Sequence, residues 1–327
     1  MKKTLAKILT LMLLLAAAGC SAETTPKNSD SANAIQVGLV QLADNGAFTD
    51  MREGFIDKLR ELGYTEEQLV IDYKNANGDT ATLNSIFQTM VDAQKDLIVT
   101  IGTPATQAIV NMDSGIPVFF ISVSNPVGAK VITDMSTPDK HATGTSNAIP
   151  VSEMFKLSDQ LTPNRQTYGL IYNTGEVNAV TTIEQAKNYL DSVGLNYKEA
   201  IVTSSSEVQQ AAESLVGSVD AFFIPNDSMV QSAMPQVAEI AKQAKLPVYG
   251  SSAVMVQSGA FATVSIDDIT IGGITAEMAV KFLKGTPIEQ IPAITVSDFT
   301  TVINQSTADA IGVTIPQDIL SHAAIIE

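Results

Sequence analysis

Short, nearly unbroken apolar runs alternate with amphipathic segments along most of this chain. The runs at 97–101, 118–121 and 221–224 are four or five residues long and carry almost no polar side chains. Such runs are typical of strands that are covered on both faces, as in a parallel sheet with helices on each side. The alternation therefore predicts an α/β protein built from repeated strand–helix units.

The apolar periodicity places the individual elements. We predict strands at 35–41, 69–73, 97–101, 118–121, 168–172, 196–202, 221–225, 248–250 and 260–266. We predict helices at 50–62, 80–94, 104–112, 152–161, 177–193, 206–216, 229–244, 252–258 and 270–284. Several of these helices end at a glycine, which is a common helix terminator.

The strand–helix rhythm restarts after Pro150, which predicts two doubly wound, Rossmann-like lobes joined by a hinge. We assign 35–148 to lobe 1 and 149–267 to lobe 2. The sheet of lobe 2 is expected to be complete after five strands, so the helix at 270–284 should return to lobe 1 within a segment of about 268–298. Crossings are expected near 147–151 and 265–269, and a further crossing by 299–327 is left open.

The N-terminal residues predict export. A basic start is followed by the apolar run 8–18 and by Ala-Gly-Cys at 18–20, which together form a secretory signal at 1–19. The apolar run is too short to span a bilayer of roughly 30 Å. The pattern resembles the lipobox of bacterial lipoproteins, so lipidation is expected at Cys20, with residues 20–34 as a polar tether. The alternative is an ordinary signal peptide in which Cys20 is incidental.

Composition narrows the possible partners and chemistry. The formal net charge of −16 disfavours nucleic acid as a partner. Cys20 is the only cysteine, and the two histidines are far apart in sequence, so no metal site and no cofactor are expected. Neither a GxSxG nor a GxGxxG motif occurs, and an enzyme is therefore not expected.

Several short motifs are similar to one protein family in their order and spacing. They are Gly102-Thr103-Pro104-Ala105-Thr106, Ser124-Asn125-Pro126, Ala142 to Asn147, Pro225-Asn226-Asp227 and Ile266-Asp267. The chain resembles, from about Ile35 onwards, the ABC-transporter substrate-binding family that includes tryptophan- and other aromatic amino-acid-binding lipoproteins. The resemblance implies a periplasmic-binding-protein type I-like fold whose lobes close on a small solute. It also implies an ABC permease and its ATPase as partners, a lipid-anchored location facing outside the cytoplasm, and a monomer.

In doubly wound sheets, ligands bind beyond the carboxyl ends of the strands, which makes polar residues at those positions candidates. From lobe 1 the candidates are Phe48, Thr49, Gly102, Thr103, Thr106, Ser124, Asn125, Ser146 and Asn147. From lobe 2 and the crossing they are Asn173, Asn226, Asp227 and Asp267, with Asn178 as a weaker choice.

Each candidate also has a purely structural interpretation. Thr103 can cap the helix at 104–112, and Asp227 can cap the helix at 229–244. Ser124 and Asn125 can form a turn, and Phe48 can act as a hydrophobic staple. Ser146 and Asn147 can serve the hinge.

The free N–H groups at 102–106 suit a carboxylate, and the amide and carboxylate at 226–227 suit an ammonium group. The sequence thus predicts a receptor for an amino acid, with an aromatic or apolar side chain as one option because Phe48 can stack on it. A sensory ligand-binding module and a receptor for a sugar or nucleoside are the alternatives.

Overall fold

The computed structural model describes residues 34–147 and 151–327. The predicted signal peptide at 1–19, Cys20 and the tether up to residue 33 lie outside the described residues, as does the segment 148–150. The lobe boundary predicted at 148/149 therefore stays a prediction. No helix in the described ranges is both long and apolar enough to cross a membrane.

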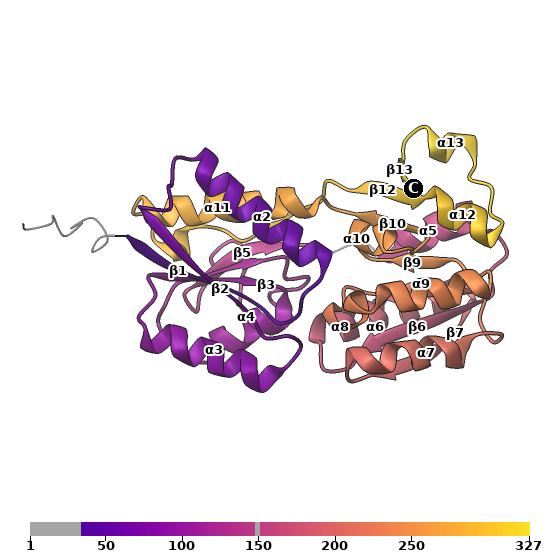
Figure 1. The fold of residues 1–327 in the computed structure, drawn as a ribbon, viewed down its shortest axis with the longest axis horizontal. Coiled ribbons are helices and arrows are strands. Elements are labelled where there is room, and N and C mark those ends of the chain that lie inside the picture. Colours follow the sequence, from indigo (N-terminus) through magenta and orange to yellow (C-terminus); the bar gives the residue numbers. More distant parts are fainter. Residues whose placement is uncertain (1–33, 148–150) are drawn as a thin grey trace, which may run out of the picture. The chain divides into compact units, whose positions relative to one another are not determined.

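Lobe 1 contains a parallel sheet whose strands lie in the order β11-β5-β4-β3-β1-β2. Figure 1 labels β1, β2, β3 and β5 of this sheet. Its strands are β1 (Ile35–Gln41), β2 (Leu69–Asn75), β3 (Leu97–Ile101), β4 (Val118–Ile121), β5 (Ala142–Ser146) and β11 (Ile294–Thr295). Its helices are α2 (Gly46–Glu61), α3 (Thr80–Asp92), α4 (Thr103–Val110) and α11 (Asp268–Leu283). Strand order reverses between β1 and β3, so the loops that follow these strands border the crevice in which doubly wound sheets bind ligands.

Lobe 2 contains the sheet β13-β12-β10-β9-β8-β6-β7. Its strands are β6 (Thr167–Asn173), β7 (Asn196–Val202), β8 (Ala221–Ile224), β9 (Val248–Gly250), β10 (Ala262–Ser265), β12 (Thr300–Asn304) and β13 (Ala324–Ile326). Its helices are α5 (Val151–Leu161), α6 (Val177–Val193), α7 (Val208–Leu215), α8 (Ser228–Ser232), α9 (Met234–Gln243), α10 (Ala253–Gln257), α12 (Gln305–Ile311) and α13 (Gln317–Leu320). Short 3₁₀ turns occur at Ser205–Glu207 and Ile288–Gln290.

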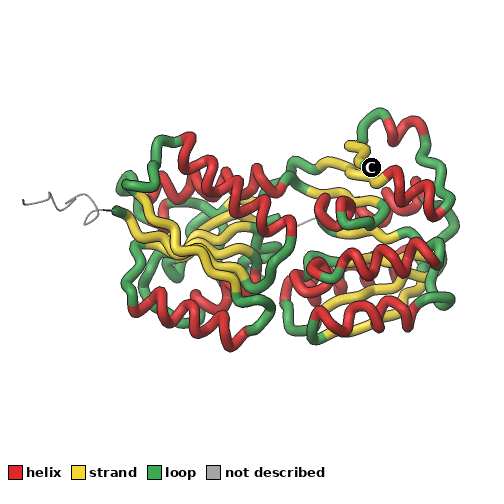
Figure 2. Tube along the Cα trace, in the orientation of Figure 1, coloured by secondary structure: helices red, strands yellow, loops and turns green. Residues whose placement is uncertain are grey.

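Both sheets are sandwiched between helices, as the tube in Figure 2 shows, and the predicted fold class of two doubly wound lobes is confirmed. The expectation that five strands complete the second sheet is wrong. Strand β12 pairs antiparallel with β10, and β13 pairs with β12, so the C-terminal residues extend this sheet. The strand β5, which pairs with β4, was not predicted because Ala-Thr-Gly-Thr-Ser lacks a bulky apolar run.

Two helices differ from the sequence prediction for local reasons. Helix α2 begins at Gly46 rather than Asp50, because the Asn45 side chain caps it by accepting a hydrogen bond from the Phe48 N–H at 2.9 Å. The helix predicted at 229–244 is divided into α8 and α9, with Pro235 in the first turn of α9. Proline is favoured there and disrupts a continuous helix because it has no N–H to donate.

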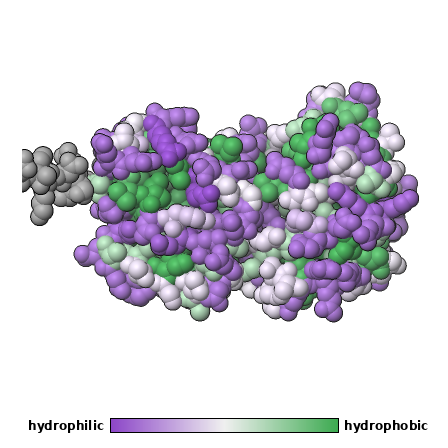
Figure 3. All heavy atoms as spheres, in the orientation of Figure 1, coloured by the Kyte–Doolittle hydropathy of each residue, from purple (hydrophilic) through white to green (hydrophobic). Residues whose placement is uncertain are grey.

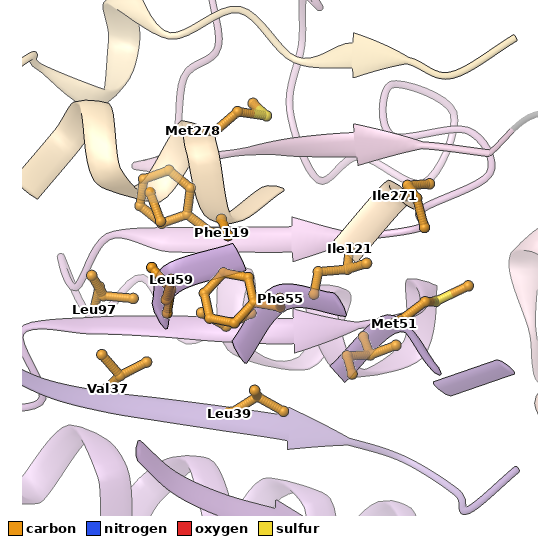
Figure 4. Close-up of a cluster of buried hydrophobic side chains, with 14 of the residues drawn as sticks. Val37, Leu39, Met51, Phe55, Leu59, Leu97, Phe119, Ile121, Ile271 and Met278 are labelled. Carbon is orange, nitrogen blue, oxygen red and sulfur yellow. The ribbon is translucent and has the colours of Figure 1, made fainter. Parts of the chain in front are cut away.

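Helix α11 closes the core of lobe 1 although 151–267 separate it in sequence from the rest of that lobe. Figure 4 shows Met51, Phe55 and Leu59 of α2 beside strand residues of the sheet, with Ile271 and Met278 of α11 nearby. All five of these side chains are buried. The apolar face of the sheet is thus covered jointly by the first and the last helix of the lobe.

The visible surface is mostly hydrophilic and has a hydrophobic area (Figure 3). Figure 3 shows hydrophilic side chains over most of the visible face, with a hydrophobic area near β1 and β2. A surface groove at this edge is lined by residues of α2, β2 and the loop between them; the apolar ones include Ile56, Leu69 and Ile71, and Arg52, Arg60 and Glu66 add charge.

Two neighbouring glycines of α11 yield a stability prediction. A Cβ atom at Gly272 would collide with the backbone of Met51 and Phe55, whereas one at Gly273 would only touch the Lys58 side chain at 3.5 Å. Gly272→Ala should lower the free energy of unfolding by about 1–3 kcal/mol, because the two helices must separate. Gly273→Ala is the matched control and should be neutral or stabilising by up to about 1 kcal/mol, since alanine favours the helix. Urea denaturation of both variants measures the difference, and equal stabilities would contradict the close helix contact.

Candidate functional site

A polar cleft lies where the carboxyl ends of the strands from both lobes meet. It contains about 520 Å³ of space between protein atoms, a figure that includes open solvent at its mouth. Lobe 1 contributes residues after β1, β3, β4 and β5, and lobe 2 contributes residues after β6, β8 and β9. The crossing from β10 to α11 supplies Ser265, Ile266 and Asp268.

The N-terminus of α4 forms the lobe 1 wall. Gly102 has a φ of +82°, a conformation that glycine adopts without strain, and its missing side chain lets the Phe48 ring lie against the backbone. The Thr103 hydroxyl is buried at the cleft and has no hydrogen-bond partner among the described residues. Thr106 differs, because its hydroxyl donates to the Gly102 carbonyl at 2.8 Å and also pairs with Thr100. A free hydroxyl beside the first N–H groups of a helix suits a carboxylate.

Two buried carboxyl groups form the lobe 2 wall. Asp227 caps α8, since its Oδ1 accepts from the Met229 and Val230 N–H groups at 3.0 Å and its Oδ2 accepts from the Asn173 N–H. Glu176 accepts hydrogen bonds from the Ser228 hydroxyl and N–H. Burial, together with the nearby Asp227 charge, raises the pKa of Glu176 to about 8, and burial raises the pKa of Asp227 as well.

A third carboxyl group, that of Asp268, reaches the cleft from the first turn of α11. Asp268 is 7% exposed, and no hydrogen bond to its side chain occurs among the described residues. Burial raises its pKa well above the usual value, and the charges of Asp50 and Asp267 raise it further.

The structure brings together part of the predicted set. The cleft is lined by Phe48, Gly102, Thr103, Ser124, Asn147, Asn226, Asp227 and the weaker candidate Asn178. The candidates outside its lining are Thr49, Thr106, Asn125, Ser146, Asn173 and Asp267.

Most of the candidates outside this lining have structural partners. Asn125 accepts from the Gly128 N–H in a turn, and Asn173 accepts from the Gly175 N–H. Ser146 donates to the Ser124 carbonyl. Asp267 is exposed and caps α11 by accepting from the Thr270 N–H at 2.6 Å, so the acid that faces the cleft is its neighbour.

Sequence reasoning missed several lining residues: Glu176, Gln231, Ser251, Ser252 and Asp268. Glu176 lies in the loop after one predicted strand, just as Asp227 follows another, and this position was a usable signal that was overlooked. The serines gave no signal, because isolated serines are frequent in loops. The orientation of Asp268 depends on where α11 begins, which periodicity defines only to within a few residues.

Neutral polar side chains connect the lobes across the cleft. Gln231 donates to the Asn45 side chain at 2.8 Å, and Ser232 donates to the Asp44 carbonyl at 3.0 Å. Asn226 donates to the Ser124 hydroxyl at 3.3 Å, and Ser124 in turn donates to Asn147 at 3.0 Å. These contacts hold the lobes close together in this conformation.

Two doubly wound lobes around a polar cleft define a solute-binding protein of the periplasmic-binding-protein type I-like class. Residues 36–326 match the family described as ABC transporter substrate binding protein, and the chain belongs to this family. It is 33% identical over 294 residues to the tyrosine-binding protein of Clostridioides difficile, a match that covers 90% of this chain and 85% of the relative.

Solved structures of substrate-binding proteins also match this chain over most of its length. The chain superposes with a TM-score of 0.86 on a Streptococcus pneumonia ABC domain in complex with L-Trp, at 31% identity, covering 90% of this chain and 100% of the other. The ligand-free, open structure of a Clostridium difficile substrate-binding protein with adhesive properties matches at 33% identity with a TM-score of 0.67, covering 90% of this chain and 99% of the other.

The raised pKa of Glu176 yields a prediction for stability against pH. Its pKa in the folded state exceeds the unfolded value of about 4.5, so its contribution to stability is complete below pH 4.5 and is lost as the pH rises towards 8. The free energy of unfolding should therefore fall between about pH 5 and pH 8, and Glu176→Gln should flatten this fall by about 1–3 kcal/mol. Urea denaturation at several pH values measures it, with the exposed Glu213→Gln as control. Identical profiles for wild type and Glu176→Gln would contradict the assignment.

Proposed function

We propose that the protein is the lipid-anchored, extracytoplasmic receptor of an ABC importer, which captures an amino acid between its lobes and delivers it to the permease and its ATPase. The observation that carries the proposal is the charge pattern of the cleft. An unpartnered hydroxyl lies at a helix N-terminus on one side, and carboxyl groups lie on the other side and at the crossing. A zwitterion matches this pattern, because its carboxylate suits the helix end and its ammonium suits the acids.

The lining also argues against other solutes and against catalysis. Within the described residues, the cleft lining contains no lysine, arginine, histidine or cysteine. A phosphorylated solute would lack a basic partner there, and the usual nucleophile–base pairs are missing. A sugar or nucleoside would leave the carboxyl at Asp268 without a charged partner.

Phe48 favours an aromatic or apolar ligand side chain. Its ring lies against Gly102 at the cleft, where it can stack on a flat group. The ligands named for the two relatives, tyrosine and L-Trp, agree with this interpretation.

The conformation supports capture by closure. Two relatives of nearly equal identity differ in TM-score, 0.86 for the structure with L-Trp and 0.67 for the ligand-free, open structure. The lobes of this chain, connected by the Gln231–Asn45 and Asn226–Ser124 hydrogen bonds, are thus arranged more like the ligand-bound relative. Hinge closure of this kind is common among binding proteins. A sensory module would share the fold and closure, and transport is favoured here by family membership.

Binding of amino acids is the direct test. Isothermal titration of the purified chain with the twenty common L-amino acids should yield at least one tight ligand, with aromatic ones foremost. Thr103→Val should weaken that ligand about 10- to 100-fold, because a hydrogen bond to a charged group is lost. Thr106→Val is the control; its hydroxyl bonds internally, so it should lower stability more than affinity. Tight binding of a sugar with no amino acid bound would refute the proposal.

The anchor is tested separately. Cys20→Ala should leave ligand affinity unchanged while it abolishes lipidation and impairs uptake of the ligand by cells, because a tethered receptor works at high local concentration beside its permease. Membrane fractionation and radiolabelled uptake measure the two effects. Unimpaired uptake by a fully soluble variant would contradict the role of Cys20.

A further inference from the structure

The three carboxyl groups of the cleft differ in how many hydrogen bonds they accept from the rest of the protein. Asp227 receives three backbone N–H groups, and Glu176 receives the hydroxyl and N–H of Ser228. Both groups therefore have a structural task at the start of α8. Asp268 has no partner among the described residues, although it is more than nine-tenths buried and lines the cleft.

The surroundings of Asp268 contain no positive charge that could compensate it. Helix α11 packs on α2, β4 and β5. The charged groups that act on Asp268 are Asp50 of α2 and Asp267 beside it, both acidic, while β4 and β5 contain no titratable side chain. A buried carboxyl without a partner destabilises the empty protein, so its presence is explained by a partner that arrives with the ligand.

A metal ion does not fit as that partner. In the part of the chain that the structure describes, no group of three or more His, Cys, Asp or Glu side chains is arranged to hold a metal. A nitrogen cation needs only one carboxylate together with neutral acceptors, and the Ser265 side chain lies in the same lining.

We propose that Asp268 is the carboxylate that receives the positively charged nitrogen of the bound ligand. This inference rests on the proposed amino-acid receptor and specifies which of its acids binds the ammonium group. From the sequence, the ammonium group was expected to bind at residues 226–227. Because the Asp227 carboxyl already accepts backbone hydrogen bonds, we place the ammonium site instead at the crossing between β10 and α11.

Binding at Asp268 also couples the ligand to protons. In the empty protein its pKa is raised by burial and by the Asp50 and Asp267 charges. A bound cation lowers this pKa, so a ligand that binds below the pKa of the empty state releases a proton from Asp268. Affinity therefore rises with pH until Asp268 is ionised in the empty protein.

The experiment compares Asp268→Asn with Asp267→Asn in the full-length mature chain. The tightest amino acid from the panel of twenty is titrated into each, together with its desamino analogue, for example L-tyrosine and 3-(4-hydroxyphenyl)propionate. Asp268→Asn should weaken the amino acid about 30- to 1,000-fold. It should change the affinity for the desamino analogue less than about threefold, since that compound lacks the ammonium group. Asp267→Asn preserves a capping side chain outside the cleft and removes only the smallest of the effects on Asp268, so it should bind both compounds within about threefold of wild type.

A measurement on wild type keeps the inference testable if Asp268→Asn does not fold. Titration at a series of pH values in two buffers of different ionisation enthalpy should show proton release on binding of the amino acid, and none with the desamino analogue. The same release in Glu176→Gln assigns the proton to Asp268 rather than to Glu176. Loss of affinity for both compounds by the same factor would indicate a merely structural role and overturn the inference, as would the absence of proton release.

The two proposals fail in different ways. If wild type binds an amino acid and Asp268→Asn binds it within threefold, the assignment of Asp268 is wrong and the receptor function stands. If wild type binds neutral polyols but no amino acid, the receptor function is wrong and the assignment falls with it.

Discussion

The contact between α2 and α11 determines where the functional groups of this protein lie. Gly54 and Gly272 let the two helices approach until backbone meets backbone, with Gly54 beside Ile269 and Gly272 beside Met51. Around this contact Phe55 and Ile271 are fully buried. Because α11 must return to lobe 1 to cover the sheet, the chain has to cross from lobe 2 directly before it, at 265–268. The crossing thus passes along the cleft, and core packing places Asp268 there.

The cleft combines satisfied polar groups with unsatisfied ones. Asp227, Glu176 and Thr106 are occupied by backbone and side-chain partners and shape the walls. Among the described residues, the Thr103 and Ser251 hydroxyls and the Asn178 Oδ1 atom are buried in the cleft lining without a hydrogen-bond partner, and the Asp268 carboxyl, which also lines the cleft, accepts no hydrogen bond. Buried polar groups are nearly always hydrogen-bonded in folded proteins, so unpartnered ones that line a cleft are candidates for contact with a ligand.

The sequence was sufficient for the fold class because apolar runs such as 97–101 and 118–121 have one plausible environment, a sheet covered on both faces. It did not reveal β5, whose five small or polar residues become buried only through their neighbours. The sequence prediction chose Asp267 as the acidic residue at the crossing, one residue away from the acid that lines the cleft. In the structure Asp267 caps α11, and Asp268 faces the cleft. Adjacent residues of a helix start point about 100° apart, so side-chain direction depends on the cap, which tertiary contacts fix.

The bonds that connect the lobes suit a receptor that must open again. They join neutral groups, such as Gln231 with Asn45 and Asn226 with Ser124, and each such bond contributes only about 1 kcal/mol net. The acids of the cleft oppose closure of the empty protein, since burial disfavours their ionised forms and no basic residue of the described lining offsets them. A cationic group removes that cost only when both walls surround it. In the proposed receptor, a cationic ligand would therefore bind the closed state better than the open one, and this difference in affinity would drive closure.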